Sequence, residues 1–168
     1  ILATPRLTLR ESTVSDVEDF YRIYQDPSIT KYMENLFPDR DEERSYMKDY
    51  IQKIYGFYGF GLWSVIHTVT GTVIGRAGLS VREGYKLPEL GFVTEVAFQH
   101  QGYTYEICEA ILRYAWDELE FPQVQAFCHP ENTASLHLLQ KLGFTYAGED
   151  LLQGIPHARY IVSLPKSC

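Results

Sequence analysis

The stretch ELGFVTEVAFQHQGYT, residues 89–104, decides the fold of this chain. Its first part is apolar in the manner of a strand, and the glycine at position 102 separates it from a long amphipathic segment with helical spacing. A strand that leads through a glycine-containing turn into a helix presents backbone N–H groups at the helix N-terminus, where phosphate binds well. The stretch therefore predicts a site for a phosphate-bearing cofactor.

Outward from this stretch, hydrophobic periodicity and turn residues predict the remaining elements. Two capping-box patterns, Ser15 with Glu18 and Asp39 with Glu42, open helices. We expect helices at about residues 15–25, 39–55, 102–119 and 132–142. We expect strands at about residues 6–11, 62–67, 72–80, 89–97, 124–128, 144–147 and 157–164, with residues 148–156 as a connection.

The order of these elements predicts an α/β (mixed α+β) fold. It implies one mixed central sheet of about six to seven strands with helices on both faces. At 168 residues, without an internal repeat, linker or low-complexity segment, we expect residues 1–168 to form a single domain.

Composition narrows the class of protein. There is no apolar run long enough to span a bilayer and no secretory leader, so we expect no membrane partner. The three cysteines have no metal-type spacing, and an odd count favours a reducing cytoplasm. We therefore expect no metal site, buried structural thiols at Cys108 and Cys128, and a mobile tail residue at Cys168.

The net charge of −7 is distributed unevenly. Residues 1–88 carry 11 basic and 12 acidic groups, whereas residues 89–168 carry 4 basic and 10 acidic groups. Without a basic stripe to neutralise phosphates, a nucleic-acid partner is not expected. The acidity either attracts a cationic substrate such as an amine or serves only solubility, and both interpretations stay open.

Several motifs, in this order, resemble the GNAT N-acetyltransferase superfamily, and in particular its ribosomal-protein N-terminal acetyltransferase branch. They are TPRLTLR at residues 4–10, GLWSV at 61–65, IGRAGL at 74–79, ELGF at 89–92, HPENTAS at 129–135 and KLGF at 141–144. The resemblance covers nearly the whole chain. It implies an acetyl-CoA-dependent enzyme that transfers the acetyl group directly to a primary amine in a ternary complex.

The resemblance also implies which residues bind the cofactor. The end of the strand before the turn, at Thr94 and Val96, pairs with the pantetheine arm. The backbone of Gln101, Gly102, Tyr103 and Thr104 holds the pyrophosphate, and glycine permits a close approach. Asn132 contacts the cofactor side of the cleft and also fits the N-cap of the last helix.

Two residues are candidates for catalysis. Glu89, at the start of the strand that faces the cleft, is the candidate general base, working through water, with Glu95 as the alternative. Ser135 is the candidate to protonate the departing thiolate. The acceptor is left open among a peptide N-terminus, a polyamine, an aminoglycoside-like drug and a small metabolite amine, as is the choice of monomer or homodimer. Aromatic residues at 32, 55, 57, 58, 60 and 63 are expected to form core or cleft wall.

The sequence departs from the family pattern near the turn. The family prefers Gly or Ala where Thr104 stands, often has Gly at His100 and Lys or Arg at Gln101, and in this branch has Pro at Val96. Loss of the cation should weaken pyrophosphate binding by about 1 kcal/mol. Two alternatives follow: a non-catalytic acyl-CoA-binding module, and a different phosphate-ligand enzyme on an α/β sheet.

Overall fold

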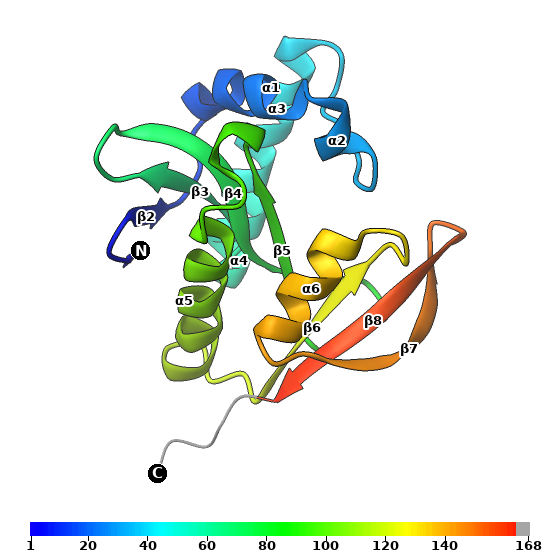
Figure 1. The fold of residues 1–168 in the computed structure, drawn as a ribbon. Coiled ribbons are helices and arrows are strands. Elements are labelled where there is room, and N and C mark those ends of the chain that lie inside the picture. The colour runs from blue at the N-terminus through cyan, green and yellow to red at the C-terminus, as the bar shows by residue number, and fades with distance from the viewer. Residues whose placement is uncertain (164–168) are drawn as a thin grey trace.

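An eight-stranded mixed sheet forms the centre of the protein in a computed structural model that describes residues 1–163 (Figure 1). The strands are β1 (Leu2–Ala3), β2 (Leu7–Arg10), β3 (Leu62–His67), β4 (Thr72–Ser80), β5 (Glu89–Thr94), β6 (Gln123–Cys128), β7 (Thr145–Leu152) and β8 (Ile155–Ser163). Their order across the sheet is β1-β2-β3-β4-β5-β6-β8-β7, and only β5 and β6 pair in parallel. The predicted mixed sheet is confirmed. The additional strand is β1, in which Leu2 pairs with Leu9 of β2.

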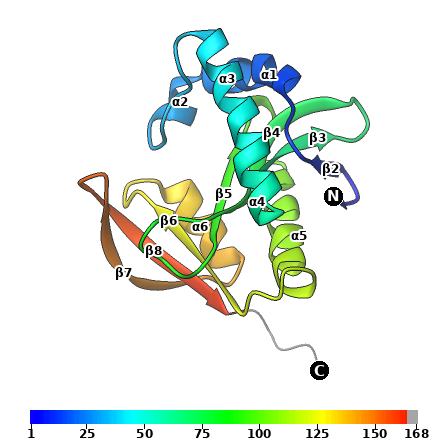
Figure 2. The same ribbon diagram turned by 180° about the vertical axis from the view of Figure 1, so that it is seen from behind.

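Helices cover both faces of the sheet, as predicted (Figures 1 and 2). They are α1 (Val17–Tyr24), α2 (Pro27–Thr30), α3 (Arg40–Tyr50), α4 (Gly56–Tyr58), α5 (Tyr103–Asp117) and α6 (Thr133–Lys141). Shorter turns are the 3-10 turns η1 (Val14–Asp16) and η3 (Val96–Phe98), and the π-helical turn η2 (Ile51–Tyr55) that joins α3 to α4. Helices α1 and α3 lie on one face, and α5 and α6 lie on the other.

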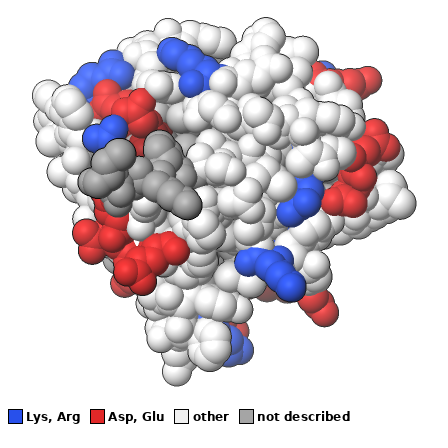
Figure 3. Space-filling model, turned by 90° about the horizontal axis from the view of Figure 1, so that it is seen from below, with Lys and Arg blue, Asp and Glu red and all other residues white. Residues whose placement is uncertain are grey.

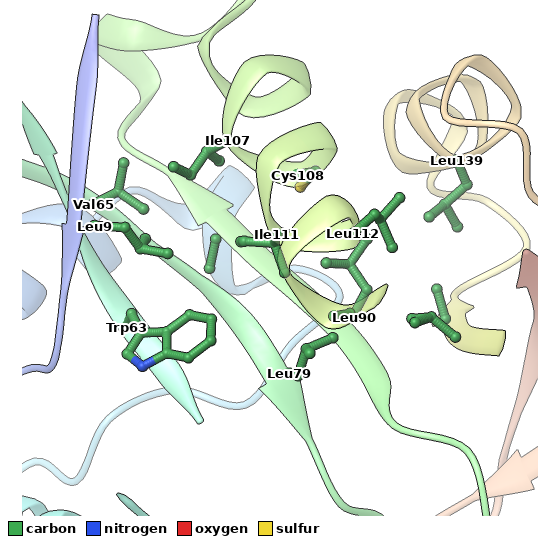
Figure 4. Packing of buried hydrophobic residues seen from close by; sticks show 14 of the residues in the cluster. Leu9, Trp63, Val65, Leu79, Leu90, Ile107, Cys108, Ile111, Leu112 and Leu139 are labelled. Atoms are coloured by element: carbon green, nitrogen blue, oxygen red, sulfur yellow. The ribbon is translucent and has the colours of Figure 1, made fainter. Parts of the chain in front are cut away.

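The core follows from the alternation of side chains along the strands. On one face, Leu9, Trp63 and Leu90 are buried against Ile107 and Ile111 of α5 (Figure 4). On the opposite face, a second cluster joins α1 and α3 to the sheet; it contains Val17, Phe20, Ile23, Met47, Val73 and Val93. The sheet is therefore buried on both faces where β2 to β5 run, which fixes these strands as a rigid platform.

Some predicted boundaries are wrong for local reasons. The hairpin of residues 62–67 and 72–80 is confirmed, but the strand predicted over 89–97 ends at Thr94 because the chain turns into η3. Residues 148–156 belong mostly to β7 and β8. A register shift between Tyr146 and Glu149 marks a bulge that breaks the alternating pattern there. Position 164, the predicted end of the last strand, lies outside the described residues.

The helical segment around the predicted Ser15 opens with the 3-10 turn η1 at Val14, one residue earlier than predicted, whereas the α-helix α1 begins later, at Val17. The carboxylate of Asp16 accepts the N–H of Thr13 at 2.9 Å, so the capping pair is Thr13 with Asp16, two residues before the predicted Ser15 and Glu18. Asp16 is held there by Arg10 of β2 at 2.7 Å. This ion pair to the sheet is the reason why the earlier start is preferred.

The surface shows no continuous basic stripe on the face seen in Figure 3, where Lys and Arg side chains lie apart from one another. Within residues 1–163, no helix has the length and apolar character needed to cross a bilayer.

The feature that positions the functional site is the separation of β5 from β6. Their only paired residues are Glu89 and Gln125, near the start of both strands. Beyond that point the strands diverge, as Figure 1 shows. Parallel neighbours normally exchange backbone hydrogen bonds along their whole length. The later residues of β5 therefore have one edge that no neighbouring strand covers.

Candidate active site

The N-terminus of α5 has several backbone N–H groups without an acceptor among the described residues. Its N-cap, Gly102, has a φ of 83°, and the N–H groups of residues 100–105 find no acceptor within residues 1–163. The other long helices are closed by side chains: Asp39 caps α3 at 2.8 Å and Asn132 caps α6 at 3.3 Å. Free N–H groups at a helix start attract negative charge. The α5 N-terminus can therefore hold a phosphate of the kind predicted for the sequence.

The loop before α5 is held in shape by its own side chains. Gln99 donates through Nε2 to the carbonyl of Thr94 at 2.8 Å, and Gln101 donates through Nε2 to the carbonyl of Ala97 at 3.1 Å. Between them, His100 has a φ of 62°, a left-handed conformation that glycine adopts more readily. Holding a residue with a Cβ in this conformation costs about 1 to 2 kcal/mol. The preference for glycine at position 100 thus has a conformational reason.

Arg6, at the start of β2, contacts the same loop and was not among the predicted site residues. Its guanidinium donates to the carbonyl of Gln101 at 3.0 Å, pairs with Glu106 at 2.8 Å and lies 4.1 Å from the centre of the Tyr103 ring. It brings a positive charge to a loop that lacks one at position 101. The TPRLTLR motif that contains Arg6 was recognised in the sequence, but a contact 95 residues away has no local signal.

Two predicted cofactor residues, Thr94 and Thr104, meet at the top of β5. Their hydroxyl oxygens lie 2.7 Å apart, so the side chain of Thr104 is turned toward the strand. Val96 differs from the prediction because it lies in η3 and not in a strand, with 42% of its surface exposed. It cannot extend the free edge of β5. By alternation from the Glu89 pairing, the backbone groups of Phe92 and Thr94 lie on that edge.

Glu89 lies where β5 and β6 still touch, at the closed end of the separation. Its carboxylate accepts two hydrogen bonds from Arg82, the second at 3.0 Å, and its side chain is 16% exposed. Leu90 faces α5, so Glu89 points to the opposite side of the sheet. Its alternative, Glu95, is paired with Arg22 of α1 at 3.2 Å. Both carboxylates are thus held by arginine.

Asn132 and Ser135 begin α6, which follows the diverging end of β6. The side-chain oxygen of Asn132 accepts the N–H of Ser135, which is the capping role expected from its position. The hydroxyl of Ser135 is half-buried and makes no hydrogen bond within residues 1–163. Glu89 thus lies on β5 at the closed end of the opening, whereas Ser135 lies in α6, which follows the open end of β6.

Several aromatic residues of the 32–63 region prove to be core. Tyr55, Phe60 and Trp63 are buried, whereas Phe57 is 78% exposed. Tyr32 reaches across to the loop before α6, where its ring stacks on His129 with centroids 4.9 Å apart. Tyr32 therefore connects the segment after α2 with the loop before α6.

The cysteines lack the character of nucleophiles. Cys108 and Cys128 are free and buried, as predicted, and burial raises the pKa of each thiol. A raised pKa leaves little thiolate at neutral pH. Cys168 lies outside the described residues. Within residues 1–163, no group of three or more His, Cys, Asp or Glu side chains is arranged to hold a metal ion.

Two Bacillus proteins are similar in sequence to most of this chain. The N-acetyltransferase p20 of Bacillus licheniformis, described as uncharacterized, is 30% identical over 151 residues, 88% of this chain and 83% of its own. The similarly described N-acetyltransferase YnaD of Bacillus subtilis is 28% identical over 148 residues, covering 88% and 84%.

Solved structures share the fold. Ribosomal-protein-S5-alanine acetyltransferase from Vibrio fischeri has a TM-score of 0.80 at 13% identity, covering 96% of this chain and 95% of its own. Spermidine N-acetyltransferase from Vibrio cholerae, solved with CoA and spermine, has a TM-score of 0.79 at 18% identity, covering 95% and 96%. The family model described as the acetyltransferase (GNAT) domain matches residues 6–145. The chain therefore belongs to the GNAT acetyltransferase family.

Proposed function

We propose that this protein binds acetyl-CoA and transfers its acetyl group to the nitrogen of a primary amine. The observation that carries the proposal is the free edge of β5 beside the uncapped N-terminus of α5. A strand edge pairs with an amide-containing chain, and a helix start binds phosphate. Coenzyme A contains an amide-bearing pantetheine arm followed by a pyrophosphate. The free thiols support a reducing cytoplasm as its location, with residues 1–168 acting as one domain.

In the proposal, the pantetheine arm pairs with the backbone of Phe92 and with the N–H of Thr94, whose carbonyl already accepts from Gln99. The pyrophosphate lies on the N–H groups of residues 101–104, and Arg6, which is paired with Glu106, holds the carbonyl of Gln101. Thr104 leaves room for this approach because its hydroxyl is bonded to Thr94. Asn132 shapes the opposite side of the cleft by holding the first turn of α6.

The reaction joins the amine nitrogen to the carbonyl carbon of the thioester and breaks the C–S bond. The attacking amine loses a proton, which Glu89 accepts through a water molecule while Arg82 orients its carboxylate. The departing thiolate gains a proton from the hydroxyl of Ser135, directly or through water, and the proton taken up by Glu89 returns to Ser135 through solvent, which restores both side chains. The products are the N-acetylated amine and the free thiol of coenzyme A.

The decisive experiment mixes the protein with acetyl-CoA and a panel of primary amines and measures free thiol. We expect thiol release that depends on an amine, with stoichiometric acetylation detected by mass spectrometry. Binding of acetyl-CoA without thiol release for any amine would favour an acyl-CoA-binding module. A nucleotide that raises the melting temperature when coenzyme A does not would favour a different phosphate-ligand enzyme.

Gly102→Val tests the anion site. A β-branched residue at a φ of 83° distorts the start of α5, so we expect the dissociation constant for coenzyme A to rise at least tenfold by calorimetry. Gly154→Val is the matched control, because Gly154 has a φ of 77° in a turn with open space around it. Equal affinity in both variants would remove the α5 N-terminus from the site.

The Glu89→Gln variant tests which of Glu89 and Glu95 is the general base. Removal of a general base should lower kcat by about 100-fold or more, with the fold retained by circular dichroism. Glu95→Gln breaks a comparable ion pair and should leave kcat within about threefold of the wild type. A larger loss in Glu95→Gln than in Glu89→Gln would reverse the assignment.

Ser135→Ala tests the proposed acid. The variant should lower kcat by about tenfold or more while the Michaelis constant for acetyl-CoA stays within about twofold. Its melting temperature should match that of the wild type, since the hydroxyl makes no hydrogen bond within the described residues. Ser163→Ala, at the exposed end of β8, is the control. Unchanged turnover in Ser135→Ala would exclude this role.

A further inference from the structure

Helix α6 ends in a lysine that the proposed reaction does not use. Lys141 is the last residue of α6, and it is exposed. Its Nζ atom lies 4.4 Å from the centre of the Tyr105 ring. Tyr105 is in the first turn of α5, which lies on the same face of the sheet as α6 (Figure 1). The contact therefore holds an ammonium group beside the helix start that carries the free N–H groups.

Lys141 has no acidic partner within residues 1–163, since none of the ion pairs there includes it. One turn after Tyr105 on α5, Glu109 lies beside the Tyr105 hydroxyl and is already paired with Arg113 at 3.7 Å. An aromatic ring attracts an ammonium group but brings no net negative charge. The charge of Lys141 is thus available to an anion from outside the chain.

The other cations of residues 89–163 lie away from this helix start. These residues contain three Lys or Arg residues, namely Arg113, Lys141 and Arg159. Arg113 lies about 15 Å along α5 from its first residue. Arg159 of β8 donates through Nε to the side chain of Gln125 at 2.9 Å. Gln125 is in register with Glu89, so this contact is on the face of the sheet opposite α5 and α6. Within residues 89–163, Lys141 is therefore the Lys or Arg residue beside the α5 N-terminus.

Coenzyme A carries a third phosphate that needs such a cation. One ribose bears the pyrophosphate on its 5′-oxygen and a phosphate monoester on its 3′-oxygen, so only the sugar ring separates the two groups. The monoester has a charge of about −1.5 to −2 at pH 7. Arg6 reaches the same loop but is paired with Glu106 at 2.8 Å. A pyrophosphate on the N–H groups of residues 101–104 therefore leaves the third phosphate within reach of Lys141, next to the first turn of α5.

We propose that Lys141 binds the 3′-phosphate of coenzyme A and so makes the protein selective for coenzyme A over its 3′-dephospho form. This inference rests on the proposed function, since it needs the pyrophosphate on the start of α5. Lysine binds phosphate as a point charge, and the Tyr105 ring limits the freedom that its side chain loses on binding. The cofactor then meets a positive charge on α6, although position 101 carries none. Lys141 is thus a residue that determines cofactor specificity.

The test measures by calorimetry the dissociation constants of coenzyme A and 3′-dephospho-coenzyme A, which differ only in this phosphate. The wild type should bind coenzyme A about tenfold more tightly, because one charge-assisted contact is lost in the dephospho form. In Lys141→Met, which keeps the apolar stem, this ratio should fall to about one, with the dissociation constant of the dephospho form unchanged within about twofold. Lys141→Arg keeps the charge and should keep the preference. Arg113→Met removes an equal charge from α5 and is the matched control, which should also keep the preference.

Salt provides a second measurement on the unmodified protein. An exposed ion pair is screened, so the wild-type preference for coenzyme A should shrink toward one in about 0.5 M NaCl. Lys141→Gln also removes the charge and repeats the comparison if circular dichroism shows that Lys141→Met does not fold.

Equal affinity of the wild type for the two ligands would overturn the inference and leave the coenzyme A site of the proposed function intact. A preference that survives in Lys141→Met would also overturn it, and would restrict Lys141 to a favourable interaction with the dipole of α6. Failure of both ligands to bind the wild type would instead contradict the proposed function itself.

Discussion

The structure depends on one contact between two parallel strands. Glu89 and Gln125 pair, and no later residue of β5 pairs with β6, although the carbonyl of Thr94 accepts a hydrogen bond from the side chain of Gln99. A sheet normally satisfies the backbone groups of its inner strands, so a gap in the middle must be filled from elsewhere. Helices α5 and α6 both pack on the same face of the sheet, against residues of these strands. The gap is therefore built into the packing, and an extended ligand with amide groups is what it can accept.

The two faces of the sheet then have different roles. On one face, α5 directs its free N–H groups toward the end of β5, which suits the phosphates of coenzyme A. On the other face, Glu89 is bound by Arg82 of the loop that follows β4. In the proposed reaction, cofactor and acceptor would approach the gap from opposite sides and meet across the backbone of β5. Such an approach would separate the binding of the two substrates while bringing their reacting atoms together.

The departures from the family pattern near α5 are compensated by distant parts of the chain. His100 keeps the left-handed conformation that glycine would adopt, and the side chains of Gln99 and Gln101 hold the loop around it. Arg6 donates a hydrogen bond to the carbonyl of Gln101, while its charge is paired with Glu106. These substitutions change how the anion site is stabilised and leave its free N–H groups in place.

The order of strands and helices, the 62–80 hairpin and the glycine turn before α5 could be predicted from the sequence, because periodicity, caps and turn residues act over a few neighbours. The motifs likewise placed Asn132 and Ser135 at the start of α6. The approach of Arg6 to Gln101 and the two hydrogen bonds from Arg82 to Glu89 could not be predicted, nor could the lack of an acceptor for Arg76 Nε within residues 1–163. These depend on which side chains tertiary packing brings together and which it leaves unpaired. Charge pairing acts through space, so only the folded arrangement of strands and helices decided them.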